Sequence, residues 1–263
     1  MPSLVHAAAA TRLARRSLLV APVLLAAPCQ AAPALDDTAF YTAYPYVEPA
    51  DILPFLEAQT QPGDADGLLA AMDAFASRYP MYGLGQVKGE ALEAEARKRR
   101  PAQALEVGTF LGYSAVRTAR SLAPGGRLLC VEASPQHAAV ATWVLKRAGL
   151  ADCAEVLVGL SSKLLPAVAA RLGPAGADWV FLDHAKECYL EDTLALEALG
   201  VIRRGTLVAA DNVVYPGAPG YLEHMAAPQY ATRLVEAPVE YEQVWRKDWV
   251  VGKTDAISFS TKA

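Results

Sequence analysis

Between residues 102 and 210, short apolar runs alternate with helix-like segments of about ten residues, and this alternation limits the fold more than any other feature. The apolar runs indicate strands, and a helix-like segment follows each of the first four. The predicted strands are 104–108, 128–132, 155–158, 179–182 and 206–210, and the predicted helices are 114–122, 137–148, 163–172 and 190–199. Strands and helices that alternate in this way form right-handed βαβ units, and therefore a parallel sheet with helices on both faces.

Two further strand-like runs lie near the C-terminus, at 240–245 and 256–260, with no helix-like segment between them. Two strands joined without a crossover helix can pair as an antiparallel hairpin. The predicted fold class is therefore α/β: a Rossmann-like, doubly wound sheet that is mostly parallel and carries an antiparallel C-terminal hairpin at its edge.

The first 35 residues contain no Asp or Glu, three arginines, and the apolar run 17–27 followed by small residues. This order is typical of a cleavable signal peptide. The apolar run is shorter than the ~20 residues of a membrane-spanning helix. An organellar transit peptide, a twin-arginine signal and an uncleaved anchor are the alternatives. We therefore expect targeting to the secretory pathway or to an organelle, with membrane contact only through this segment if it is not cleaved.

The rest of the chain divides into an N-terminal extension and a main domain. Residues 36–65 are rich in Pro, Asp and Tyr and indicate a linker with short helical turns. Apolar spacing predicts one helix over 66–78 and another, stopped by Pro101, over 88–100. The predicted divisions are 1–35 for targeting, 36–80 for an extension with helices, and 81–263 for the main domain.

Composition limits the partners of this chain. Hydrophobic residues make up 53% of it, which is enough to bury a substantial core and argues against disorder. The net charge is -4, and the body of the chain carries no basic cluster. Nucleic acid is therefore not an expected partner.

Two carboxylates and a carboxamide follow two of the predicted strands. Asp183 comes directly after the fourth strand, and Asp211 and Asn212 come directly after the fifth. Because the carboxyl ends of parallel strands line a ligand crevice, these side chains are expected to meet there. Their oxygens suit a hard divalent cation such as Mg²⁺. Lys186 adds a candidate base, so the set predicts proton removal from a metal-bound hydroxyl.

The loop between the first predicted strand and its helix contains Gly108 and Gly112, which let the backbone approach a ligand closely. Their spacing departs from the dinucleotide pattern G-x-G-x-x-G, so the loop suits a nucleoside without a pyrophosphate better than NAD. Glu132 ends the second predicted strand, where a carboxylate can accept hydrogen bonds from a ribose diol. Taken separately, an ordinary tight turn and a solvated acid are the alternatives.

Four motifs surround these features. They are Gly112-Tyr-Ser-Ala-Val-Arg, Phe181-Leu-Asp-His-Ala-Lys, Tyr189-Leu-Glu-Asp-Thr-Leu and Ala210-Asp-Asn-Val-Val-Tyr-Pro-Gly-Ala-Pro. Together they resemble the class I S-adenosylmethionine-dependent methyltransferases and, more narrowly, the cation-dependent catechol O-methyltransferase family. The resemblance runs from about Tyr82 to the C-terminus. It implies a methyltransferase domain over 81–263, with S-adenosylmethionine and Mg²⁺ as cofactors.

The resemblance also assigns roles to individual residues. It implies Mg²⁺ ligands at Asp183, Asp211 and Asn212, and a general base at Lys186. The implied cofactor contacts are Leu84, Glu106, Gly108, Tyr113, Ser114, Glu132, Ser161, Asp183 and His184. The implied substrate contacts are Lys186, Asn212, Pro216 beside the aromatic ring, and Glu240, a catalytic carboxylate that would hydrogen-bond a catechol hydroxyl.

Two positions depart from the family's pattern. Ala185 stands where the family usually has a tryptophan packed on the adenine edge, and a second tryptophan of the catechol pocket falls near Pro80. The first change bears on cofactor affinity and the second on substrate choice.

The expected function is transfer of the methyl group of S-adenosylmethionine to one hydroxyl of a Mg²⁺-bound catechol, a small-molecule substrate. One alternative is an enzyme for another vicinal diphenol, such as a caffeoyl ester or a flavonoid. The other is a catalytically silent relative that acts as a binding protein. Retention of Lys186 together with all three implied metal ligands favours an enzyme.

Overall fold

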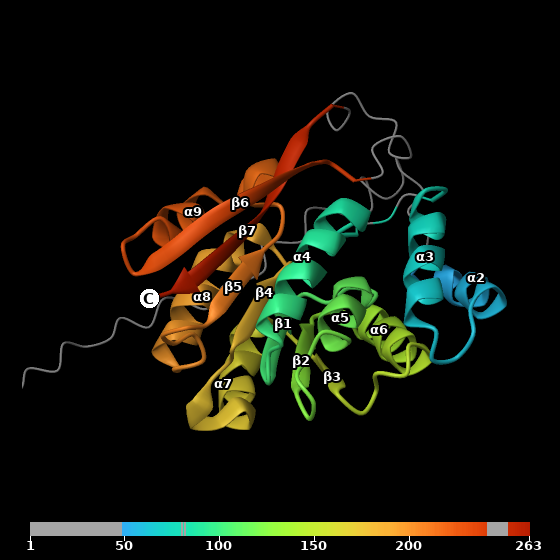
Figure 1. Ribbon diagram of the computed structural model, residues 1–263, viewed down its shortest axis with the longest axis horizontal. Helices are drawn as coiled ribbons and strands as arrows, with labels where there is room; N and C mark the ends of the chain where they lie inside the picture. The colour runs from blue at the N-terminus through green and yellow to red at the C-terminus, as the bar shows by residue number, and fades with distance from the viewer. Residues whose placement is uncertain (1–48, 80, 82, 241–251) are drawn as a thin grey trace, which may run out of the picture.

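The computed structural model describes residues 49–79, 81, 83–240 and 252–263, which contain one seven-stranded sheet (Figure 1). The strand order is β3-β2-β1-β4-β5-β7-β6. The strands are β1 Gln103–Val107, β2 Arg127–Glu132, β3 Ala154–Val158, β4 Trp179–Leu182, β5 Leu207–Ala210, β6 Tyr230–Pro238 and β7 Thr254–Lys262. The first five pair in parallel, whereas β7 is antiparallel to both β5 and β6. The predicted fold class is confirmed.

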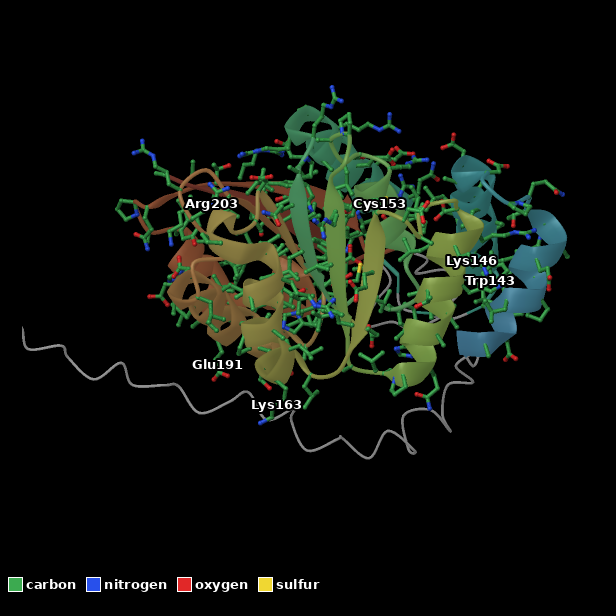
Figure 2. The ribbon with its side chains drawn as sticks, turned by 90° about the horizontal axis from the view of Figure 1, so that it is seen from below. Trp143, Lys146, Cys153, Lys163, Glu191 and Arg203 are labelled. Carbon is green, nitrogen blue, oxygen red and sulfur yellow. The ribbon has the colours of Figure 1, made fainter. Side chains whose placement is uncertain are left out.

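Helices cover both faces of the sheet (Figure 1, Figure 2). One face carries α4 Gln86–Arg99, α5 Tyr113–Ala119 and α6 Pro135–Arg147, and the other carries α7 Ser161–Leu172, α8 Tyr189–Ala198 and α9 Pro219–Met225. Helix α3 (Ala65–Ala76) packs against α5 and α6, and α2 (Ile52–Gln59) packs against α3. The short turns are η1 Pro49–Asp51, η2 Gly173–Ala175, η3 Lys186–Cys188 and η4 Val213–Gly217.

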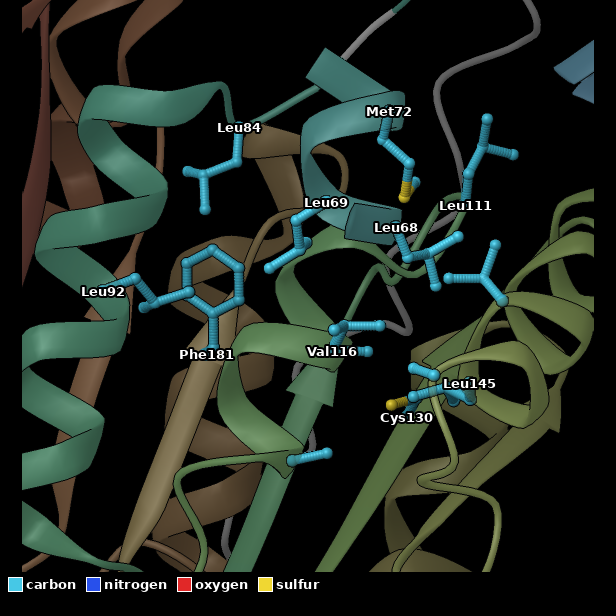
Figure 3. Close-up of a cluster of buried hydrophobic side chains, with 14 of the residues drawn as sticks. Leu68, Leu69, Met72, Leu84, Leu92, Leu111, Val116, Cys130, Leu145 and Phe181 are labelled. Carbon is cyan, nitrogen blue, oxygen red and sulfur yellow. The ribbon is translucent and has the colours of Figure 1, made fainter. Parts of the chain in front are cut away.

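Side-chain alternation along each strand separates two hydrophobic clusters. In β4, Trp179 and Phe181 face the cluster beneath α4, α5 and α6, whereas Val180 and Leu182 face the cluster beneath α7, α8 and α9. Figure 3 shows part of the first cluster, where Leu92 of α4 points toward Phe181. All four β4 side chains are fully buried. Burial on both faces explains why the central strands are continuous apolar runs in the sequence.

All the strands and helices predicted between residues 102 and 210 form, with small shifts at their ends. Besides short turns, two helices and one strand of the described chain were not predicted: α2, which forms where a linker with short turns was expected, α9, and β6. Strand β6 is one of the two edge strands, and most of its side chains are exposed, so it lacks the period-two apolar pattern. The predicted strand 240–245 lies outside the described residues, except for Glu240, which is in a turn.

The N-terminal extension shares a core with the sheet. Leu68, Leu69 and Met72 of α3 belong to the first cluster (Figure 3). The predicted division at residue 80 stays a prediction. Within the described part of the chain, no helix is long and apolar enough to cross a membrane. The predicted targeting segment, 1–35, lies outside that part.

Candidate functional site

The ends of β4 and β5 bring the two acidic clusters side by side. Leu182 pairs in register with Ala210, so Asp183 and Asp211 follow their strands at the same level. Each also donates its backbone N–H to the neighbouring strand: Asp211 to the Leu182 carbonyl at 3.0 Å, and Asp183 to the Val107 carbonyl at 2.9 Å. Backbone pairing alone therefore places both carboxylates at the carboxyl edge of the sheet.

Lys186 lies beside the first carboxylate, in η3. Its Nζ atom donates to Asp183 Oδ1 at 3.0 Å and to the Tyr189 hydroxyl at 2.8 Å. That hydroxyl lies 2.9 Å from the Leu182 carbonyl oxygen and 3.0 Å from the Asp211 carbonyl oxygen. Burial raises the pKa of Tyr189, so its hydroxyl stays neutral. The Lys186 amine is therefore held between the ends of β4 and β5.

A second lysine, Lys88 of α4, lies beside the other carboxylate, and sequence reasoning missed it. Its Nζ atom is 2.9 Å from Asp211 Oδ1 and 2.7 Å from Oδ2 of Asp255, in β7. All three side chains are at most 2% exposed. Burial disfavours the charged amine, but the two carboxylates outweigh it and raise the pKa of Lys88. Burial, opposed by Lys88 and reinforced by Asp183, raises the pKa of Asp211 to about 7.

The sequence does contain a signal for this pair. Lys88 shares a helix face with Leu92 and Ala96, which are buried in the first cluster. Asp255 shares a strand face with Ile257, which belongs to the same cluster. A charged side chain on an otherwise apolar face needs a partner of opposite charge when it is buried. The apolar periodicity of α4 and β7 therefore places both Lys88 and Asp255 on buried faces, and from this their pairing could have been predicted.

The loop after β1 comes too close to its neighbours for a side chain at Gly108. Gly108 has φ +86, and a Cβ atom there would lie 2.5 Å from the Asp183 carbonyl oxygen. Gly112 has φ +89 and precedes α5, with a Cβ position 3.2 Å from Ala141 Cα. Both positions need a backbone conformation that glycine adopts readily. The predicted glycine loop thus runs directly against the segment that carries Asp183.

Glu106 lies in β1 and is fully buried. Its Oε1 atom accepts hydrogen bonds from Thr109 Oγ1 at 2.7 Å and from Ser114 Oγ at 2.9 Å. Its Oε2 atom is buried and has no hydrogen-bond partner among the described residues. Burial raises the pKa of Glu106 to about 8, although the two hydroxyl groups lower it. A buried acceptor without a partner can receive a donor from a bound molecule.

Glu132 ends β2 and meets the loop that follows β1. Its Oε2 atom accepts from the Phe110 N–H at 2.9 Å, and its Oε1 atom accepts from the Ser134 N–H at 2.9 Å. Burial would raise the pKa of Glu132, but hydrogen bonds from His137, Ser134 and Phe110 outweigh it and lower the pKa. An ionised carboxylate therefore lies beside the glycine loop, where the sequence placed a ribose contact.

The other predicted cofactor contacts lie in or next to the elements that carry this site. Tyr113 and Ser114 are the first residues of α5, Leu84 is buried before α4, and Ser161 begins α7. His184 follows Asp183 directly, and its Nε2 atom lies 2.8 Å from Asp192 Oδ2. Its Nδ1 atom is buried without a partner among the described residues. None of these contacts tests a cofactor role.

Glu240 meets the beginning of α4. Its carboxylate takes backbone hydrogen bonds from Val87 and Lys88, and burial raises its pKa despite them. A Cβ atom at Gly85 would lie 2.1 Å from Glu240 Cγ, so glycine makes room for this carboxylate. Acceptors are favourable here because the first N–H groups of a helix lack partners within the helix. Glu240 Oε1 is buried and has no partner among the described residues.

The structure describes only one of the two positions that depart from the family pattern. Ala185 is exposed, between His184 and η3. A small exposed side chain leaves that flank of the site without the aromatic wall that the resemblance implies. Pro80 lies outside the described residues. Pro216 follows Tyr215 through a cis peptide bond and is exposed.

The residues around Asp211 fit a hard cation by their chemistry. Among the described residues, no group of three or more His, Cys, Asp or Glu side chains could hold a metal. The candidate set contains only two carboxylates, and its third member is the carboxamide of Asn212. Asp211 Oδ1 is buried and accepts no hydrogen bond from the described residues, although Lys88 Nζ lies 2.9 Å away. A buried, unsatisfied carboxylate oxygen is a suitable ligand for Mg²⁺.

Comparison with known proteins defines the class. The model of the O-methyltransferase family matches residues 88–237, more than half of the chain. The chain therefore belongs to the O-methyltransferase family. The matched region includes most of α4, the glycine loop, both acidic clusters and most of β6.

Individual relatives show which O-methyltransferases the chain resembles. The catechol O-methyltransferase of Mus musculus is 42% identical over 175 residues, which span 66% of this chain and just under two thirds (66%) of that protein. The catechol O-methyltransferase of Sus scrofa is 45% identical over 142 residues, 54% of this chain and 76% of that protein. Among solved structures, the O-methyltransferase TomG from Streptomyces achromogenes, in complex with SAM, has a TM-score of 0.62 at 26% identity, covering 81% of this chain and 96% of TomG. The resemblance to catechol O-methyltransferases is confirmed.

Proposed function

We propose that the protein transfers the methyl group of S-adenosylmethionine to one hydroxyl of a catechol, with Mg²⁺. The observation that carries the proposal is the position of Lys186. Its amine donates to Asp183, which directly follows β4, and to the Tyr189 hydroxyl, beside the paired ends of β4 and β5. Deprotonation of a cation-bound hydroxyl needs a base within hydrogen-bond reach of the ligand oxygens. The identity of 42% and 45% to two catechol O-methyltransferases supports the same reaction.

S-adenosylmethionine would bind at the glycine loop. Glu132 would accept hydrogen bonds from its ribose hydroxyls, and Glu106 Oε2 would accept one from its ammonium group. The same resemblance that assigns these two roles proposes contacts from Leu84, Gly108, Tyr113, Ser114, Ser161, Asp183 and His184. The TomG complex with SAM supports this class of cofactor.

Asp183, Asp211 and Asn212 would hold the cation. When bound there, Mg²⁺ lowers the pKa of a coordinated hydroxyl by stabilising its anion. The buried Oδ1 atom of Asp211 supports this assignment, because Lys88 Nζ lies 2.9 Å away as a charge partner but makes no hydrogen bond to it. The amide of Asn212 also supports it, because its Nδ2 atom donates to Asp255 at 2.9 Å and leaves the carbonyl oxygen for another partner.

Lys186 would take the hydroxyl proton on its Nζ atom, which must be neutral at that moment. S-adenosylmethionine, held at the glycine loop, would supply the methyl group to the deprotonated hydroxyl oxygen and would be released as S-adenosylhomocysteine. Because the sulfonium is already activated, the chain contributes mainly alignment and exclusion of water. Pro216 would lie along the aromatic ring, and the unpartnered Oε1 atom of Glu240 would accept from the second hydroxyl.

A second candidate is methylation of another vicinal diphenol, such as a caffeoyl ester or a flavonoid. Val214 lies two residues after Asn212 and is 47% exposed. Pro216 is also exposed. Exposed apolar side chains next to a site can cover a larger apolar substituent than a simple catechol carries. This feature favours a bulkier substrate at the same catalytic centre.

One experiment separates these possibilities. The purified protein is given labelled S-adenosylmethionine and Mg²⁺ with dopamine, caffeic acid or a flavonoid diol in separate reactions. We expect label on a vicinal diphenol and none in EDTA, and the order of kcat/KM ranks the two substrate classes. Transfer that persists in EDTA would remove the role of the metal. Binding of S-adenosylmethionine without transfer to any diphenol would indicate a silent binding protein.

The N-terminal segment has its own proposal. Residues 1–35 would target the protein to the secretory pathway or to an organelle, because they combine arginines, an apolar run and small residues without acids. Fusion of this segment to a fluorescent reporter and N-terminal sequencing of the recovered protein test it. A reporter that stays in the cytosol with an intact N-terminus would contradict targeting.

A further inference from the structure

Asp255 is the most fully engaged carboxylate near the site, and no family motif contains it. It is 0% exposed, in the second position of β7. Its Oδ2 atom accepts from Lys88 Nζ at 2.7 Å and from Asn212 Nδ2 at 2.9 Å. Its Oδ1 atom accepts from the Tyr215 N–H at 2.9 Å, with the Val214 N–H at 3.4 Å. One side chain thus connects α4, the end of β5 and η4.

The contact with Asn212 decides which way its amide points. Asn212 Nδ2 donates to Asp255 Oδ2 at 2.9 Å, so the NH₂ end of the Asn212 amide faces Asp255. The carbonyl oxygen of Asn212 must then lie on the opposite side of the amide. A carbonyl oxygen, and not an NH₂ group, is the end that can bind a hard cation.

The contact with Lys88 divides one positive charge between two carboxylates. Lys88 Nζ lies 2.7 Å from Asp255 and 2.9 Å from the nearer oxygen of Asp211. Lys88 Nζ also lies 3.0 Å from the other oxygen of Asp211, so the ammonium group contacts both carboxylates at once and shares its donors between them.

The backbone contacts hold the segment that bears Asn212. Asn212 has φ +56, in the left-handed region, which costs free energy for a residue with a side chain. The N–H groups of Tyr215 and Val214 point at Asp255, so η4 is held against the start of β7. Without these contacts, the backbone at Asn212 would lose part of what keeps it in this conformation.

We propose that Asp255 is a positioning residue for the metal site: its contact with Asn212 Nδ2 turns the Asn212 carbonyl oxygen toward the cation, and its contacts with the Tyr215 and Val214 N–H groups hold the segment that bears Asn212. This inference rests on the proposed Mg²⁺ site. Asp255 itself does not coordinate the cation, since both its oxygens are occupied by donors of the protein.

The test is direct titration of the full-length protein with Mn²⁺, a spin-active substitute for Mg²⁺, followed by electron paramagnetic resonance. Asp255→Asn is nearly isosteric, but its amide can donate to Asn212 and so permits the wrong orientation. Loss of such an outer partner weakens metal binding by about 10- to 100-fold. We expect that loss, together with an unchanged calorimetric affinity for S-adenosylmethionine. The Mg²⁺ concentration for half-maximal turnover should rise by a similar factor, with kcat recovered at saturating Mg²⁺.

The matched control is Asp178→Asn. Asp178 Oδ2 also accepts two backbone N–H groups, from Ala102 and Gln103, but at the opposite end of β4. This variant should bind Mn²⁺ as the wild type does. Equal Mn²⁺ affinity in Asp255→Asn and the wild type would overturn the inference and leave the proposed function intact. A wild-type protein that binds no Mn²⁺ would remove both.

A polarity swap keeps the inference testable if Asp255→Asn alone does not fold. In Asn212→Asp, two carboxylates face each other, whereas in Asn212→Asp with Asp255→Asn an amide again donates to a carboxylate. We expect the double variant to bind Mn²⁺ at least about tenfold more tightly than Asn212→Asp alone, a coupling that independent sites do not show. Equal affinities of these two variants would overturn the positioning role.

Discussion

Two lysines lie beside the paired carboxylates, and their surroundings differ. Lys88 is 2% exposed and lies between two buried carboxylates, whereas Lys186 is 17% exposed and contacts one carboxylate and one neutral hydroxyl. The first environment holds a permanent positive charge, because burial of either carboxylate without it would be costly. The second leaves an amine near solvent and near the open edge of the site.

Both lysines lie at the site, but they differ in the number of their negative partners, and we expect this number to decide their roles. Lys88 comes from α4, on one face of the sheet, and reaches Asp211 from the buried side. Lys186 comes from η3, directly after β4, and reaches Asp183 from the exposed side. We therefore expect substitutions of Lys88 to affect stability and substitutions of Lys186 to affect turnover.

The largest expected effect is on turnover in Lys186→Ala. Loss of a general base should lower kcat by about 10²- to 10⁴-fold, whereas S-adenosylmethionine should still bind. Labelled methyl transfer and calorimetry measure the two quantities. Lys163→Ala, an exposed lysine of α7 (Figure 2), is the control and should keep full turnover. Undiminished turnover in Lys186→Ala would mean that the base is assigned wrongly.

The next effect is on stability in Lys88→Met. Removal of one partner leaves Asp211 and Asp255 buried without their cation, which should cost about 3–5 kcal/mol of unfolding free energy. Chemical denaturation at neutral pH measures it. Lys98→Met, in the exposed ion pair with Glu95, should cost only ~0–1 kcal/mol. A loss for Lys88→Met no larger than that of Lys98→Met would contradict the contrast between the two lysines.

Glu106 is a buried carboxylate without a lysine partner, so it tests what burial alone does to a charged group. The pKa of Glu106 is raised from 4.5 to about 8 in the folded protein, so folding favours its protonated form. Its contribution to stability is complete below the unfolded pKa and is lost as pH rises through the folded pKa. Between about pH 6 and about pH 8, the cofactor-free wild type should lose about 2 kcal/mol relative to Glu106→Gln.

Denaturation of the two proteins across this range measures the difference. Glu132→Gln is the control: because the folded pKa of Glu132 is lowered, Glu132 is ionised in both the folded and the unfolded state over this range, and the curve of this variant should run parallel to that of the wild type. Parallel stability curves for the wild type and Glu106→Gln would show that Glu106 is ionised throughout.

The smallest expected effect is that of Tyr189→Phe, which removes a hydrogen-bond partner of Lys186 and leaves the lysine in place. We expect kcat to fall about tenfold, an effect of about 1.4 kcal/mol, because the amine loses one of its two fixed contacts. The KM for S-adenosylmethionine should not change. Combined with Lys186→Ala, the substitution should have no further effect on kcat, whereas an additive loss would show that Tyr189 acts independently of the lysine.

Much of the fold could be predicted because its central strands are buried on both faces. Continuous apolar runs such as 179–182 are visible without any tertiary information, and so are the glycines that end the following helices. Strand β6 and helix α9 could not be predicted in this way. An outer strand with exposed side chains has no apolar pattern, and its identity depends on pairing with β7.

Some residues of the candidate site could likewise be predicted from the sequence, and some of its contacts could not. Asp183 and Asp211 could be predicted, since each follows a recognisable strand and backbone register alone sets them side by side. Glu240 illustrates the other case. The resemblance assigned it a substrate contact, and the structure gives its carboxylate hydrogen bonds from the first turn of α4, a contact no local pattern contains.

The sequence by itself determined the doubly wound sheet, the glycine loop and the edge where the acidic residues gather, because these depend on the periodicity and order of local segments. Only the tertiary structure decided which charges neutralise one another. Lys88 and Asp255 are separated by 167 positions, yet they form one buried pair beside Asp211. Such pairing depends on how α4 and β7 pack across the sheet, and a buried charge tolerates no other arrangement.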